Sequence, residues 1–108
     1  MIIVTTETIP GKKITKVFGY VSQSTVRSKH IGKDISSALK SVVGGELEDM
    51  TAMQNESRQI AIGRTVEKAK ELGANAIVGL RLTSSNIMST ASEMIAYGTA
   101  VYVEDIQE

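Results

Sequence analysis

The sequence contains no cysteine, no tryptophan and a single histidine among its 108 residues. The absence of cysteine excludes disulfide bonds, a thiolate nucleophile and a metal site built on thiolates. The absence of tryptophan removes the strongest aromatic platform on which a planar cofactor could stack. The sequence therefore indicates no particular cofactor.

The chain also lacks an excess of charge, because twelve Lys and Arg residues balance twelve Asp and Glu residues. Without net charge there is no global field that draws the chain to nucleic acid or to an anionic membrane, so we expect neither as a partner. No apolar run approaches the roughly 20 residues needed to cross a bilayer. The start, MIIVTTET, has no basic segment of the kind that opens a signal peptide. We therefore expect a cytoplasmic protein.

A chain of this length fits one domain, residues 1–108, of the commonest size. The stretch IIVTT predicts a strand, which leads into Ile9-Pro10-Gly11-Lys12. Proline presets φ and glycine can adopt a positive φ, so these four residues predict a type II turn. A longer strand is expected from Ile14 to about Val26, and the two strands are predicted to form an N-terminal hairpin.

A short helix is predicted after this strand. Asp34 is a good N-cap residue, and Gly44 with Gly45 is a good stop. Between them the apolar residues recur at the spacing i, i+3, i+4, i+7 and i+8, which is one face of a helix. These residues are Ile35, Ala38, Leu39, Val42 and Val43.

A second helix is predicted from about Glu46 to Leu72, ending before Gly73. Its apolar residues fall on two arcs that are displaced by roughly a quarter turn or more, with Gly63 at the changeover. We therefore expect this helix to bend or to be covered on two sides.

Two further strands are expected, from Ala76 to Leu82 and from about Met94 to Val103, with TSSN as a turn or loop between them. The predicted order is β-β-α-α-β-β. This is an α+β fold with two layers, in which a mostly antiparallel sheet of about four strands packs with two helices.

Both faces of the longer strands are apolar. In the second strand Val17, Gly19 and Val21 alternate with Phe18 and Tyr20. The last strand carries a row of small residues at alternate positions, which permits close approach of another element: Ala96, Gly98 and Ala100. Two helices cannot easily cover both faces of a four-stranded sheet, so we expect obligate self-association. The alternative is an ordinary packed sheet with a few exposed apolar residues.

The only histidine lies in the stretch STVRSKHIGKD, among three cations. Arg27, Lys29, His30 and Lys33 precede the helix expected at Asp34, whose free N–H groups favour anions. This pattern predicts a site for a phosphate or carboxylate ligand. The alternative is a solvated charged loop, with the carboxylate of Asp34 occupying the capping position.

Arg81 is unusual because it lies inside an apolar strand. An isolated buried charge is costly, so we expect Arg81 to pair with an acid across a subunit boundary, with Glu93 as the candidate. A role in a ligand pocket is the alternative.

Metal ligands are few in this sequence. His30 is the only imidazole, and one imidazole cannot build a tetrahedral site within one chain. Met50 and Met53 have helical i, i+3 spacing, but filling gaps in a core explains methionines equally well. No G-x-S-x-G, P-loop or H-E-x-x-H motif is present, so we expect no enzyme.

Four stretches together carry a family resemblance: ITKVFGYVSQSTVRSKHIGKDI, KSVVGGELEDMT, AKELGANAIVGLRL and AYGTAVYVE. They resemble the YbjQ-like family of small bacterial and archaeal proteins, which are often labelled heavy-metal-binding. The resemblance implies an α+β subunit related in fold to the dodecin subunit and assembled as a cyclic pentamer. Fivefold symmetry would turn His30 into a ring of five imidazoles. The relation to dodecin also suggests flavin, for which the lack of tryptophan leaves little support.

The sequence leaves two hypotheses for function. The first is a non-enzymatic, cytoplasmic homo-oligomer, a pentameric ring, that binds a metal ion or a small anion at subunit boundaries. The second is a purely structural or partner-binding ring without a small-molecule site.

Overall fold

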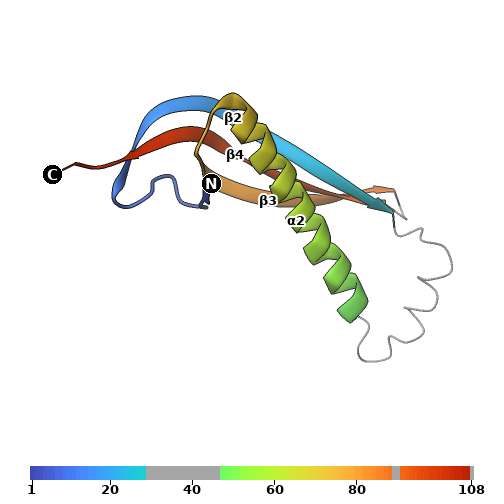
Figure 1. Ribbon diagram of the computed structural model, residues 1–108. Helices are drawn as coiled ribbons and strands as arrows, with labels where there is room; N and C mark the ends of the chain where they lie inside the picture. The colour runs from blue at the N-terminus through green and yellow to red at the C-terminus, as the bar shows by residue number, and fades with distance from the viewer. Residues whose placement is uncertain (29–46, 89–90, 108) are drawn as a thin grey trace.

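The computed structural model describes residues 1–28, 47–88 and 91–107, and there it shows one helix against a four-stranded sheet (Figure 1). The sheet order is β1-β3-β4-β2. β1 pairs with β3 in parallel, and the other two pairings are antiparallel, so the sheet is mixed. The elements are β1 (Ile2–Ile3), β2 (Lys12–Ser28), α2 (Leu47–Leu72), β3 (Ala76–Met88) and β4 (Ala91–Asp105).

The α+β class is confirmed, but the order β-β-α-α-β-β is not matched in full. The described elements run β-β-α-β-β. The short helix predicted after Asp34 falls within residues 29–46, which lie outside the described residues. The longer predicted helix is confirmed as α2, which ends at Leu72 before Gly73. Among the described helical residues, no stretch is both long and apolar enough to cross a membrane.

The predicted N-terminal hairpin is wrong, although its turn is confirmed. Gly11 has a φ of 82°, and the amide of Lys12 donates to the carbonyl of Ile9 at 3.0 Å, as in a type II turn. The chain before the turn does not pair with β2. Instead it runs along β3, where the amide of Val4 donates to the carbonyl of Ile77 at 2.9 Å. β2 is thereby free to pair with β4 from end to end.

The predicted loop TSSN is strand. Thr83 and Ser85 pair with Ile95 and Glu93 in the β3–β4 ladder, and β3 continues to Met88. Short polar residues favour turns when they are considered locally. Here the neighbouring strand β4 supplies backbone partners over the same stretch, and this tertiary pairing overrides the local preference.

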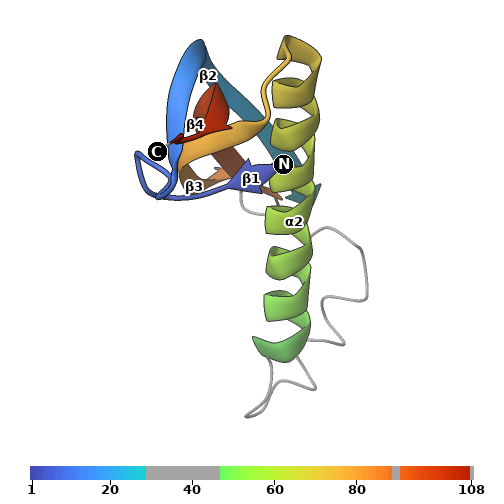
Figure 2. The ribbon, with the colours of Figure 1, turned by 60° about the vertical axis from the view of Figure 1, so that its left-hand side comes forward.

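α2 packs on one face of the sheet, mainly over β2 and β4 (Figure 2). Its buried side chains recur every four residues and are small: Ser57, Ala61, Thr65 and Ala69. Two of them are polar, but each hydroxyl donates to the carbonyl four residues earlier in the helix, at 3.0 Å from Ser57 and 2.8 Å from Thr65. Because both hydroxyls are hydrogen-bonded within the helix, the side chains of Ser57 and Thr65 can be buried against the sheet.

The small residues of β4 lie beneath this helix. Ala96 and Ala100 are fully buried, and the Thr65 hydroxyl is 3.4 Å from the carbonyl of Ala96. The element that approaches these small residues belongs to the same chain. At Ala96 it is α2, whereas the atoms nearest to Gly98 belong to β3.

The described residues cover the opposite face at one end only. There Ala76, Val78, Val101 and Val103 form a second buried cluster beneath the N-terminal segment, residues 2–9. Ile2, Val4 and Ile9 of that segment pack against the cluster. Within residues 1–28, 47–88 and 91–107, the sheet thus has a helix on one face and a single chain segment on part of the other.

A substitution at Gly98 tests the close packing of the sheet. A Cβ atom at Gly98 would lie 2.8 Å from Cγ2 of Ile77 and 3.1 Å from the carbonyl oxygen of Val78. We therefore expect Gly98→Ala to lower the free energy of unfolding by about 1–3 kcal/mol, measured by urea denaturation.

Gly63→Ala is the matched control. A Cβ atom there has open space and sits in the middle of α2, so we expect it to raise the free energy of unfolding by about 0.5–1 kcal/mol. Equal effects of the two substitutions would contradict the close packing at Gly98.

Candidate functional site

Of the four residues predicted to form the cationic ligand site, only Arg27 is among the described residues. Arg27 lies near the end of β2, with Ser92 as its partner on β4. Lys29, His30 and Lys33 lie outside the described residues. Arg81 is the partner of Tyr97, five positions along β4 from Ser92, which corresponds to roughly 17 Å of strand. The structure therefore does not bring Arg27 and Arg81 into one site.

Arg81 holds the N-terminal segment against the sheet. It is exposed, and its Nη1 atom donates to the carbonyls of Thr5 at 2.8 Å and Leu80 at 2.9 Å. Glu93, its predicted partner, pairs with Ser85 about four residues farther along the strand. An ion pair between Arg81 and Glu93 of another subunit stays a prediction. Within the chain, the guanidinium acts as a latch for residues 2–9.

The part of the face opposite α2 that residues 2–9 leave uncovered carries exposed apolar side chains among polar ones such as Ser22 and Thr99. Val17, Tyr20, Val26 and Tyr97 are 62%, 83%, 55% and 41% exposed, and we call these four residues the open face. The strand register places them together: Tyr20 pairs with Thr99, and Ser22 with Tyr97. Paired residues of an antiparallel ladder share a face. The predicted two-sided apolar character of the strands is therefore confirmed.

A β-bulge decides which residues reach the open face. The register shifts between Val17 and Gly19, so Val17 and Tyr20 share one side although they are three residues apart. Phe18 and Val21 turn to the side of α2 instead. Strict alternation had placed Val17 with Val21, which is wrong. The glycine in the strand was the only sequence signal for the bulge.

The ion pairs among the described residues lie on the surface. Lys12 pairs with Asp105 and joins the outer ends of β2 and β4. The hydrogen bond from Lys12, together with its charge, holds the pKa of the Asp105 carboxyl below its usual value. Lys68–Glu71 and Lys70–Glu67 are helical i, i+3 pairs at 3.7 and 3.6 Å. These contacts are structural.

Within residues 1–28, 47–88 and 91–107, no three His, Cys, Asp or Glu side chains converge as a metal site would require. The metal candidate from the sequence, His30, lies outside these ranges. Metal binding at His30 therefore stays a prediction.

Comparison with known proteins gives consistent matches. A YbjQ family model described as "Putative heavy-metal-binding" matches residues 1–104. A UPF0145 protein of Clostridium perfringens is 60% identical over 105 residues, which cover 97% of this chain and 99% of that protein. A UPF0145 protein of Vibrio parahaemolyticus is 54% identical over 101 residues, which cover 94% and 96%.

A solved structure has a similar fold. A protein of unknown function from Pediococcus pentosaceus, in the DUF74 family, superposes with a TM-score of 0.65 at 18% identity. The match covers 96% of this chain and 98% of that one. At this identity the likeness supports the α+β architecture.

Removing the Arg81 latch should loosen the N-terminal segment. The amide of Val4 donates to the carbonyl of Ile77, and the amide of Gly79 donates to the carbonyl of Thr6, so both hydrogen bonds join this segment to β3. In Arg81→Met we expect both amides to exchange about five-fold faster in hydrogen-exchange measurements. Arg64→Met is the control, because Arg64 donates to the carbonyl of Ser24 at 2.8 Å, away from this segment. Unchanged exchange at Val4 in Arg81→Met would contradict the latch.

Proposed function

The chain belongs to the YbjQ family of UPF0145 proteins, and from that premise we propose that it is a non-enzymatic subunit of a homo-oligomeric ring. The ring is cytoplasmic and binds a small ligand or a metal ion. The observation that carries the assembly is the open face, where Tyr20 is 83% exposed and Val17 is 62% exposed. A group of strongly exposed apolar side chains on one face of a sheet is typical of an interaction surface.

The core of one subunit is small in comparison with what it exposes. Its largest fully buried side chains are Ile77, Val101 and Thr65, and many other buried residues are alanine. The molecule is also elongated, at 60 × 24 × 16 Å. These properties suit a subunit that gains much of its burial from neighbouring copies.

β2 offers a second element for assembly. It is 17 residues long and lies at the end of the sheet order, so its outer edge has no strand partner within the described residues. Long free edges invite pairing with other chains unless they are covered. The apolar face and the free edge are adjacent because Val17, Tyr20 and Val26 all belong to β2.

The number of subunits and the bound species rest on the family. The resemblance suggests a pentamer, and the family description suggests a heavy metal. In a pentamer His30 would present five imidazoles around one axis, which is not the tetrahedral geometry usual for zinc. The cations Arg27, Lys29 and Lys33 favour a small anion as the alternative ligand near the same position.

A charge on the open face tests the assembly. We expect Tyr20→Asp to weaken each subunit contact about 100-fold or more, because an unpaired charge in an apolar interface is costly. Native mass spectrometry at micromolar concentration should then record the 11.6 kDa subunit in place of the ring. Tyr20→Phe keeps the aromatic ring and should keep the assembly. A ring that survives Tyr20→Asp unchanged would remove the open face from the interface.

The metal hypothesis predicts a stoichiometric ion in protein that is purified without a histidine tag. Elemental analysis after dialysis should find this ion in the native protein, and His30→Ala should lose it while the ring mass stays the same. Rings that contain neither metal nor ligand mass would favour the purely structural or partner-binding ring.

A further inference from the structure

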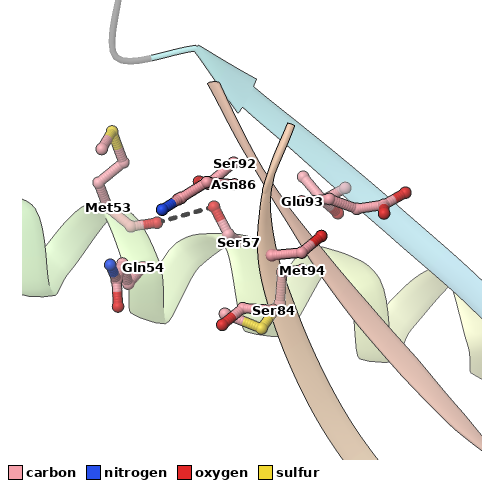
Figure 3. Close-up of a pocket in the computed structure, with 10 residues that line it drawn as sticks. Met53, Gln54, Ser57, Ser84, Asn86, Ser92, Glu93 and Met94 are labelled. Atoms are coloured by element: carbon pink, nitrogen blue, oxygen red, sulfur yellow. Dashed lines mark hydrogen bonds between the residues drawn. The ribbon is translucent and has the colours of Figure 1, made fainter. Parts of the chain in front are cut away.

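A cavity of about 150 Å³ lies between α2 and the end of the sheet at which β2 stops (Figure 3). Met53, Gln54 and Ser57 of the helix form one side. The strands contribute Thr25, Ser84 and Met94 on the other side, together with neighbouring polar residues. A cavity of this volume can hold several water molecules or one small solute. The cavity lies on the side of the sheet that faces α2, opposite the open face.

The buried hydroxyl of Thr25, which lines this cavity, needs a hydrogen-bond partner. The residue is 4% exposed, and its hydroxyl has no hydrogen-bond partner among the described residues. A buried hydroxyl without a partner destabilises a fold. Thr25 is paired with Met94, so its side chain lies on the face of the sheet that bears the cavity. An occupant of the cavity that can accept or donate a hydrogen bond would supply the missing partner.

The lining favours an uncharged ligand. Hydroxyl and amide groups dominate, and the described lining contains no Lys, Arg or His. The acid that contributes to it, Glu93, is paired with Val26, on the side of the open face, and Figure 3 shows its carboxylate directed away from Gln54 and Ser84. Among the described lining residues, an anion would therefore find no cation, and a cation would find no carboxylate directed at it.

The two methionines in the lining, Met53 and Met94, indicate that the ligand also has an apolar part. Figure 3 shows the sulfur atoms of Met53 and Met94 well apart, so the two thioethers do not converge on one soft metal ion. Separated thioethers offer apolar, adaptable surface, which suits packing against C–H groups. Hydroxyl and amide groups between such surfaces match a carbon chain that carries several hydroxyls.

We propose that this cavity binds a small uncharged polyol, which hydrogen-bonds to Thr25 and to the hydroxyl and amide groups of α2 and β3 and packs between Met53 and Met94. The site lies within one subunit. It therefore holds whether or not the ring assembles.

The probe is meso-erythritol, followed by NMR of protein with ¹³C-labelled methionine methyl groups. Saturable shifts are expected at Met53 and Met94, which line the cavity, and none at Met1, which does not. Inorganic phosphate is the comparison and should shift neither cavity methyl. An absent erythritol response, or a saturable phosphate response at the same methyls, would overturn the proposal.

A variant at Thr25 separates binding from folding. Thr25→Val keeps the shape and removes the hydroxyl, so erythritol should bind at least five-fold more weakly. The Tm of the ligand-free variant should rise by about 4 °C, because the unpartnered hydroxyl is gone. Unchanged erythritol affinity in Thr25→Val would overturn the assignment.

Filling the cavity gives an independent measurement. Ser84→Leu places a larger side chain in the lining and should abolish the methyl shifts. Gln59→Leu puts the same side chain on an exposed position of α2 that does not line the cavity and should leave them intact. Erythritol binding that persists in folded Ser84→Leu would place the polyol elsewhere.

Discussion

The contact between small residues of α2 and small residues of β4 is the constraint on which the rest of the fold depends. Ala61, Thr65 and Ala69 are fully buried on the helix, and Ala96 and Ala100 are fully buried on the strand. Small side chains on both surfaces let the helix lie close to the sheet with little intervening volume. The subunit therefore closes one face of its sheet without large side chains, and its core remains small.

The opposite face of the sheet is covered only in part by the described residues. In the part of the chain that the structure describes, one helix covers one face, and the opposite face receives only the N-terminal segment, held by the contact from Arg81 to the carbonyl of Thr5. Beyond that segment Val17 and Tyr20 remain exposed. The same geometry leaves a polar cavity beside Thr25, where the first turns of α2 diverge from the strands (Figures 1 and 2). Assembly and ligand binding would thus act on different surfaces.

Sequence patterns predicted most of each strand, the long helix and the two-sided apolar character of the sheet, and Pro10 with Gly11 predicted the turn. The patterns missed the buried stripe of α2 because Ser57 and Thr65 look polar until their hydroxyls bond back to the helix. They also missed the parallel pairing of β1, since long-range pairing has no local signal. The cavity was not predictable either, because Thr25 and Ser84 meet only through strand register. The candidate site at His30 depends on residues outside the described ranges.

Hydroxyl-radical footprinting of Tyr20 tests the central claim, that neighbouring copies cover the open face, most directly. In an isolated subunit the Tyr20 residue is 83% exposed. In a ring, Tyr20 should be oxidised much more slowly in the native protein at micromolar concentration than in the urea-unfolded chain. Oxidation of native Tyr20 at close to the unfolded rate would show a bare open face and would contradict the account.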